Sequence, residues 1–138
     1  MDKQALVTKV MIKTDVFVDG LSQTKIQVTV NTKGCKDGEL RCIASVYYAD
    51  DDSPVPDPDF VHYGAYGWYY DESVLSVYKS LYPSYDDSLY EDLEMFLPND
   101  FLPTDRDYYI KVCVFDFEEQ DYISYPSHAQ KYCFKANR

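Results

Sequence analysis

Aspartates are the residues whose type and spacing most clearly suggest chemistry in this chain. One proline-rich stretch, residues 49–59, holds Asp50, Asp51, Asp52, Asp57 and Asp59. Calcium takes roughly six to eight oxygen ligands, and acidic loops at one end of a β-sandwich supply them. The stretch is not an EF-hand loop, because Pro54 and Val55 stand where an Asx residue and a glycine belong. One hypothesis is therefore a calcium site of a different kind, with the ligands Asp50, Asp52, Asp57 and Asp59.

Aromatic side chains are interleaved with acidic ones in the same part of the chain. Rigid tyrosine and tryptophan rings provide contact area, and carboxylates steer a basic partner toward them. We expect a non-enzymatic module that binds a protein partner through an acidic, tyrosine-rich surface within residues 49–107. The residues predicted to contact that partner are Tyr66, Trp68, Tyr70, Tyr85, Asp86 and Asp87.

The same aromatic residues support a third hypothesis, a carbohydrate-binding module. Trp68 with Tyr66 and Tyr70 on one face of an extended segment would form a platform for a sugar ring. Large aliphatic residues are scarce between residues 59 and 72, so part of this aromatic set is also expected in the core. A position in the core is expected for Trp68 more than for any single tyrosine.

The acidic residues are concentrated in the middle of the chain. The net charge is −11, and residues 42–107 alone hold two Lys or Arg against fifteen Asp or Glu. The simplest interpretation is that these acids are solvated and keep an aromatic-rich protein in solution. Direct binding to nucleic acid is excluded, because the phosphate backbone requires a basic surface.

No catalytic motif is present. His62 and His128 are far apart in the sequence, and no Ser or Cys stands in a nucleophile-elbow context. The segment Gly64 to Gly67 has two glycines but neither the lysine nor the helix that a phosphate-binding loop needs. We therefore expect no enzymatic activity and no cofactor other than calcium.

The four cysteines are widely spaced. Cys35, Cys42, Cys113 and Cys133 include no close pair of the kind that structural zinc sites use. The last three lie in expected strands, where a free thiol behaves as a small buried hydrophobic group. The N-terminus has no signal-peptide core and no apolar run is long enough to span a membrane, which favours a cytoplasmic protein with reduced thiols. Removal of a signal peptide would instead imply export and disulfides.

Hydrophobic alternation predicts strands along most of the chain. Residues 5–18 and 24–31 alternate on either side of Asp19-Gly20, a hairpin signal. In the second run Ile26, Val28 and Val30 share one face. In residues 39–48 another face carries Leu40, Cys42, Ala44, Val46 and Tyr48. Residues 49–59 read as a long exposed loop.

The second half of the chain continues this pattern. Residues 73–82 are interpreted as a strand, although helical spacing also fits, and residues 89–97 as a short helix or an alternating strand that ends at Pro98. The apolar run at residues 108–117 predicts a central strand, and residues 129–136 a last one. Seven or eight strands with at most one short helix predict one all-β domain, residues 1–138, folded as an antiparallel two-sheet β-sandwich. An open barrel is the alternative, and no oligomeric state is predicted.

Residues 82–102, YPSYDDSLYEDLEMFLPNDFL, combine a Pro and Tyr, a short Asp/Ser turn and a strand that ends in Phe-Leu-Pro. This segment resembles bacterial β-sandwich modules of no assigned activity. The resemblance implies an immunoglobulin-like or C2-like sandwich and contributes no catalytic residues. The immunoglobulin hallmark itself is not met, because Trp68 lies 26 residues after Cys42 and a lysine stands two residues before Cys113.

Overall fold

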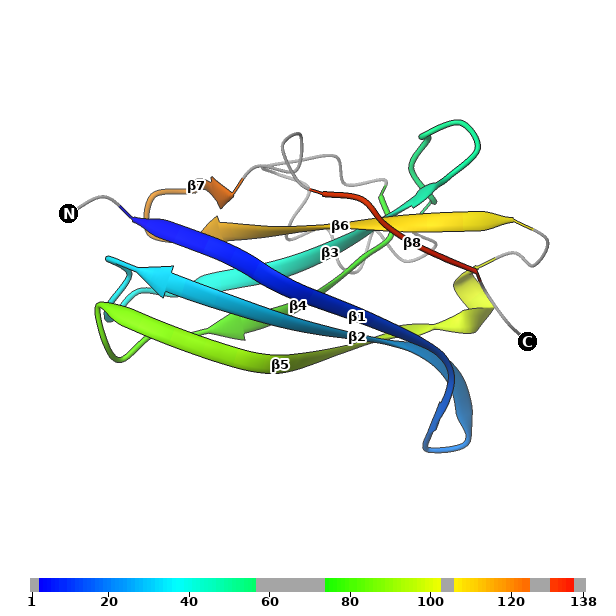
Figure 1. Cartoon of the computed structure of the whole chain (residues 1–138), viewed down its shortest axis with the longest axis horizontal. Coiled ribbons are helices and arrows are strands. Elements are labelled where there is room, and N and C mark those ends of the chain that lie inside the picture. The colour runs from blue at the N-terminus through cyan, green and yellow to red at the C-terminus, as the bar shows by residue number, and fades with distance from the viewer. Residues whose placement is uncertain (1–2, 57–73, 103–105, 125–129, 136–138) are drawn as a thin grey trace.

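The computed structural model describes residues 3–56, 74–102, 106–124 and 130–135. One sheet contains three strands in the order β1-β2-β5: β1 (Gln4–Val18), β2 (Leu21–Lys33) and β5 (Asp87–Pro98). The other contains β3 (Leu40–Tyr48), β4 (Ser76–Leu81), β6 (Asp107–Asp116), β7 (Asp121–Ser124) and β8 (Tyr132–Lys135). Its order is β4-β3-β6, and both β7 and β8 pair with the far edge of β6 (Figure 1).

All strand pairs are antiparallel, and the two sheets pack face to face. The predicted all-β sandwich with seven or eight strands is therefore confirmed. The two ambiguous segments contain strands, β4 within residues 73–82 and β5 across residues 89–97, and a 3-10 turn, η1 (Asn99–Phe101), follows Pro98. Strand β7 has only four residues and was not predicted. No helix in the described part of the chain is long and apolar enough to cross a membrane.

The turn between β1 and β2 is the two-residue hairpin that the sequence predicts. Val18 lies opposite Leu21, and the two residues between them both have positive φ, 51° at Asp19 and 81° at Gly20. Two left-handed residues in succession give the turn whose twist matches that of the flanking strands. Glycine adopts this conformation without the steric conflict of a Cβ atom.

The core lies between the two sheets. Ile26, Val28 and Val30 on β2 are fully buried, as their shared face predicts. The inward face of β3 is also confirmed: Leu40, Cys42, Ala44 and Val46 belong to the same cluster, and Tyr48 packs against it.

A second apolar cluster lies on the other face of β3 and β6. Ile43, Cys113 and Phe115 are buried there, and Phe117 and Tyr122 pack against them. Burial on both faces explains why residues 108–117 form a nearly continuous apolar run rather than an alternating one.

Two expectations are wrong. Residues 49–59 do not form an exposed loop throughout, since Val55 is only 1% exposed and its N–H donates to the carbonyl of Val46 at 3.0 Å. The flanking prolines form isolated bridges, where no ladder N–H is required of them. The expectation that Cys133 is buried is also wrong, because its side chain points outward from the short edge strand β8 and is exposed.

Candidate functional site

Strand register divides the molecule into two ends. At one end Leu40, the first residue of β3, lies opposite Leu81 and Asp116, the last residues of β4 and β6. The first residue of β5, Asp87, lies opposite Lys33, the last residue of β2, at the same end. Directly beyond this pair, the N–H of Gly34 donates to the carbonyl of Asp86 at 2.7 Å. The hairpin tip and η1 lie at the opposite end (Figure 1).

Three connections meet at the first of these ends, here termed the acidic end. They are residues 34–39 between β2 and β3, residues 82–86 between β4 and β5, and residues 117–120 between β6 and β7. Backbone hydrogen bonds join them: the N–H of Asp37 donates to Pro83 at 2.8 Å, and the N–H of Phe117 donates to Glu39 at 3.1 Å. The positive φ of Asp37, 65°, turns the first connection toward the second.

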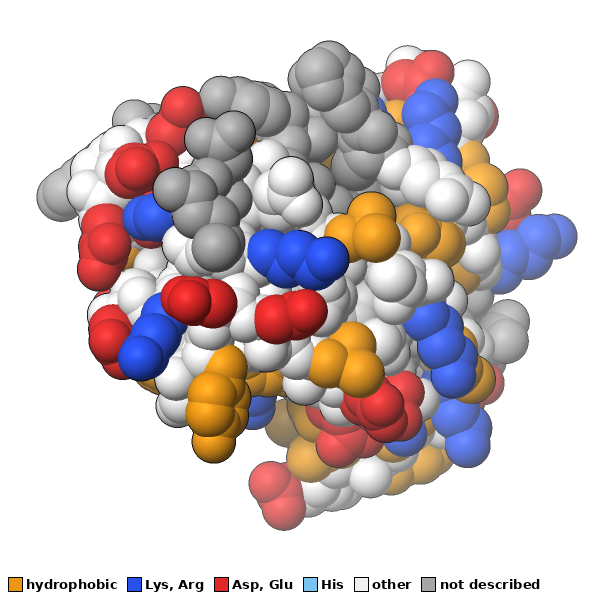
Figure 2. All heavy atoms as spheres, turned by 60° about the vertical axis from the view of Figure 1, so that its left-hand side comes forward, with side chains coloured by type: hydrophobic (Ala, Val, Ile, Leu, Met, Phe, Trp, Pro, Cys, Tyr) orange, Lys and Arg blue, Asp and Glu red, His pale blue; other side chains and the backbone are white. Residues whose placement is uncertain are grey.

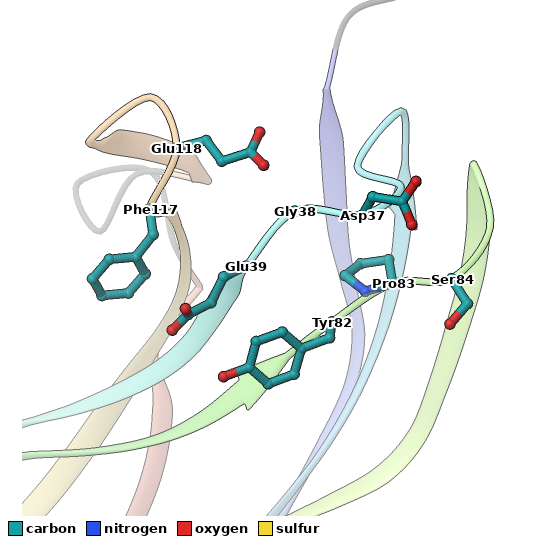
Figure 3. Close-up of a pocket in the computed structure, with 8 residues that line it drawn as sticks. All are labelled: Asp37, Gly38, Glu39, Tyr82, Pro83, Ser84, Phe117 and Glu118. Carbon is teal, nitrogen blue, oxygen red and sulfur yellow. The ribbon is translucent and has the colours of Figure 1, made fainter.

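An open pocket of about 520 Å³ lies between these connections. Each connection contributes part of its lining, as Figure 3 shows: Asp37, Gly38 and Glu39 from the first, Tyr82, Pro83 and Ser84 from the second, and Phe117 and Glu118 from the third. The left side of Figure 1 comes forward in Figure 2, where acidic side chains gather beside apolar ones.

The pocket combines carboxylates with aromatic rings. Among the described residues, Asp37 has no ion pair, whereas Glu39 lies 3.8 Å from the guanidinium of Arg41 and Glu118 lies 3.4 Å from the ammonium of Lys3. The ring of Tyr82 is 65% exposed. Carboxylate oxygens beside an accessible ring are the groups that bind a lysine or arginine side chain.

An ion pair supports the acidic end from within. Lys3 Nζ lies 2.7 Å from Oδ2 of Asp116, which is almost fully buried. The other oxygen of Asp116 accepts the backbone N–H of Glu118 at 3.0 Å and so fixes the start of the third connection. The hydrogen bond to Asp116 raises the pKa of Lys3 above its ordinary value, although burial acts in the opposite direction.

The protein already holds one cation against aromatic rings beside the pocket. The guanidinium of Arg41 lies 4.5 Å from the ring centre of Tyr78 and 4.2 Å from that of Phe117. Such contacts stabilise a cation most when it is partly removed from water. Phe117 therefore contacts Arg41 and also lines the pocket.

The structure describes three of the six residues predicted to contact a partner. Tyr85, Asp86 and Asp87 lie at the acidic end; Tyr85 is 72% exposed, and Asp87 accepts a hydrogen bond from the side chain of Asn31 at 2.9 Å. The other three, Tyr66, Trp68 and Tyr70, lie outside the described residues.

Two of the four predicted calcium ligands lie elsewhere. Asp50 and Asp52 follow β3 at the opposite end, where Asp50 accepts from Arg106 at 2.7 Å and Asp52 from Lys131 at 3.0 Å. The bond from Lys131 is the main cause of a lowered pKa at Asp52. Asp57 and Asp59 are outside the described residues, and the part of the chain that is described holds no group of three or more His, Cys, Asp or Glu placed to bind a metal ion.

None of the eight residues that line the pocket is among the predicted contact residues, although Tyr82, Pro83 and Ser84 lie within the predicted surface of residues 49–107. The eight residues come from connections that are remote in sequence, and no local motif unites them. Asp37-Gly38 is a turn-forming dipeptide in the first connection.

No protein-family model matches the chain, and no curated protein matches it. Among solved structures, the chain is similar to a bacterial adhesin from Mobiluncus mulieris that contains intramolecular disulfide, isopeptide and ester bond cross-links. The TM-score is 0.47 at 12% sequence identity, and the match covers 99% of this chain and 58% of that chain.

Proposed function

We propose that the chain is a non-catalytic binding module whose acidic end takes a lysine or arginine side chain of a protein partner. One observation carries the proposal: the carboxylates of Asp37, Glu39 and Glu118 and the exposed ring of Tyr82 surround a single open pocket. Tyr85 and Asp86, on the same connection as Tyr82, would contact the partner beside the pocket.

Size and charge both agree with such a ligand. Ligand pockets commonly measure roughly 300–1,000 Å³, and the volume of about 520 Å³ here accommodates one long side chain with part of its backbone. A net charge of −11 attracts a basic partner before contact, and the effect weakens as salt screens it. Asp37, which has no ion pair among the described residues, leaves one carboxylate open to the incoming cation.

The test uses an arginine-containing peptide and the same peptide with citrulline, which keeps the shape of arginine but carries no charge. NMR titration should show binding of the arginine peptide, with the largest shifts at Tyr82 and Glu118, and at least tenfold weaker binding of the citrulline peptide. Glu118→Gln and Tyr82→Ala should each weaken binding by roughly three- to tenfold.

Asp100→Asn is the matched control, because it removes one exposed carboxylate at the opposite end of the molecule. It should leave the affinity nearly unchanged. Equal binding of both peptides, or equal losses in Asp100→Asn and Glu118→Gln, would show that the pocket does not recognise the cation.

A further inference from the structure

The outward face of the sheet β1-β2-β5 carries large apolar side chains in water. Leu6 is 64% exposed, Met11 49%, Leu89 56% and Phe96 36%. Antiparallel sheets with one solvated face usually carry polar residues there. Several large apolar side chains exposed on one face, interspersed with polar ones, indicate an association site.

Charged residues on this face are separated by sign. Lys9 and Lys13 lie on β1, while Glu91, Asp92 and Glu94 lie on β5. The central strand β2 contributes Lys25, which lies 3.5 Å from Glu94. The β1 edge is therefore basic as far as Lys13, with the exposed Asp15 beyond it, and the β5 edge is acidic.

The register arranges these residues in rows across the three strands. In the first row Asn31 separates Leu6 from Leu89. In the second row Thr29 of β2 is paired with Lys9 of β1. On its other side Thr29 lies beside Glu91 and Asp92, at the bulge of β5. The N–H of Asp92 donates to the hydroxyl of Thr29 at 3.4 Å. Each of these two rows has complementary residues at its ends, whereas the following two rows end in Met11 and Glu94 and in Lys13 and Phe96.

We propose that this face binds the same face of a second copy of the chain. A two-fold axis that runs parallel to the strands between two stacked sheets places β1 of each copy over β5 of the other without shifting the rows. Leu6 then meets Leu89 of the second copy, and Lys9 meets Glu91 and Asp92. A two-fold axis across the strands would instead stack β1 on β1 and bring lysines together.

The expected affinity follows from the size of the face. Three strands at roughly 4.8 Å spacing and four rows at about 7 Å give a total buried area on the order of 1,000 Å². This is at the lower limit for specific association, so the dimer should form at micromolar rather than nanomolar concentrations. The surface does not include the pocket, and the two proposals are independent.

Sedimentation equilibrium of the full chain over about 1 μM to 1 mM tests the proposal. The wild type should pass from monomer to dimer within this range, and Lys9→Glu and Glu91→Lys should each shift the transition to at least tenfold higher concentration. An equimolar mixture of the two variants should associate again, because both cross-copy contacts then join opposite charges. A β1-on-β1 arrangement does not predict both results, the weaker association of each single variant and its recovery in the mixture.

Lys36→Glu is the matched control, since it makes the same charge change on an exposed residue of the β2–β3 connection. It should leave the transition where it is in the wild type. A wild type that stays monomeric throughout overturns the proposal and leaves the face to a different partner. Association that Lys9→Glu does not weaken, or a mixture that fails to associate, overturns the arrangement.

Discussion

Lys3 and Asp116 are 113 positions apart in the chain, and their side chains lie 2.7 Å from each other. Lys3 directly precedes β1 in one sheet, and Asp116 ends β6 in the other, so the ion pair joins the two sheets at the acidic end. The carboxylate of Asp116 is 1% exposed and the side chain of Lys3 is 21% exposed. A buried carboxylate needs such a counter-charge, because leaving it unpaired in a medium of low polarity is unfavourable.

Lys3→Met should therefore destabilise the protein. Removing one partner of a fully buried ion pair costs about 3–5 kcal/mol, but Lys3 is partly exposed and its charge is screened, so about 1–3 kcal/mol is expected. Urea denaturation measures the change in free energy of unfolding. Lys36→Met, which removes an exposed lysine from the same end, should change it by less than about 0.5 kcal/mol. Equal effects of the two substitutions would contradict the role given to the Lys3–Asp116 pair.

The contribution of Lys3 should disappear at alkaline pH. Its folded-state pKa is raised above the ordinary value of 10.5, mainly by the hydrogen bond to Asp116. The raised pKa means that the stabilisation is fully present below pH 10.5 and is lost as the pH rises through the folded-state value. The stability difference between wild type and Lys3→Met should be constant near neutral pH and shrink above this point. A difference that grows with alkaline pH would have the wrong sign.

Tyr109 should ionise late. It is 3% exposed, and burial, followed by its hydrogen bond to Asp52, raises its pKa to about 12 from an ordinary 10.0. NMR titration of ring-labelled tyrosine should resolve this signal, and Asp52→Asn should lower the pKa of Tyr109 because it removes the negative charge and weakens the hydrogen bond. Asp50→Asn is the control, since the carboxylate of Asp50 pairs with Arg106 instead. Equal shifts in both variants would exclude the specific contact.

Local pattern was enough to predict most of the strands. The alternation around Ile26, Val28 and Val30 identifies the buried face of β2, and Asp19-Gly20 identifies the hairpin, because both depend on neighbouring residues alone. The burial of Val55 was not predictable in this way, since it depends on backbone bonds to Val46 and Leu75 that only the folded sheet brings near. Strand β7 has too few residues for a periodic pattern.

The candidate site was less accessible from the sequence than the fold. Asp52 and Asp86 belong to one acidic part of the chain, but β4 runs back along β3 and ends opposite Leu40, which places residues 82–87 at the opposite end from Asp52. The predicted continuous surface is thus divided between two ends. The pocket brings residues 37–39, 82–84 and 117–118 together, and its composition follows from strand order rather than from any motif.

Asn99→Ala should test how η1 is attached to β2. The side-chain carbonyl of Asn99 accepts from the buried hydroxyl of Thr24 at 2.6 Å, and its amide donates to Ser22 at 2.7 Å. Truncation leaves the Thr24 hydroxyl without this acceptor, which should lower the free energy of unfolding by about 1–3 kcal/mol in urea denaturation. Asp100→Ala, at an exposed neighbouring position, should have little effect. Thr24→Val combined with Asn99→Ala should lose less than the sum of the two single changes if the hydrogen bond is the cause.

The thiols should separate into one that reacts in the native state and three that do not. Cys133 is exposed, whereas Cys35, Cys42 and Cys113 are buried. Burial raises the pKa of Cys42 to about 12 and also raises those of Cys113 and Cys35, which keeps all three thiols protonated and unreactive. A chromogenic disulfide reagent should therefore modify one thiol rapidly, and Cys133→Ser should abolish that phase.

The remaining thiols should react at a rate set by unfolding, so their rate should rise with urea in parallel with the loss of folded protein. Cys35 is the most informative of the three, because it lies in the β2–β3 connection that also forms the pocket, and the N–H of Gly38 donates to its carbonyl at 3.2 Å. If Cys35 reacted much faster than Cys42 and Cys113 in native buffer, the connection would open without global unfolding. That result would contradict a pocket wall held rigidly by its backbone hydrogen bonds.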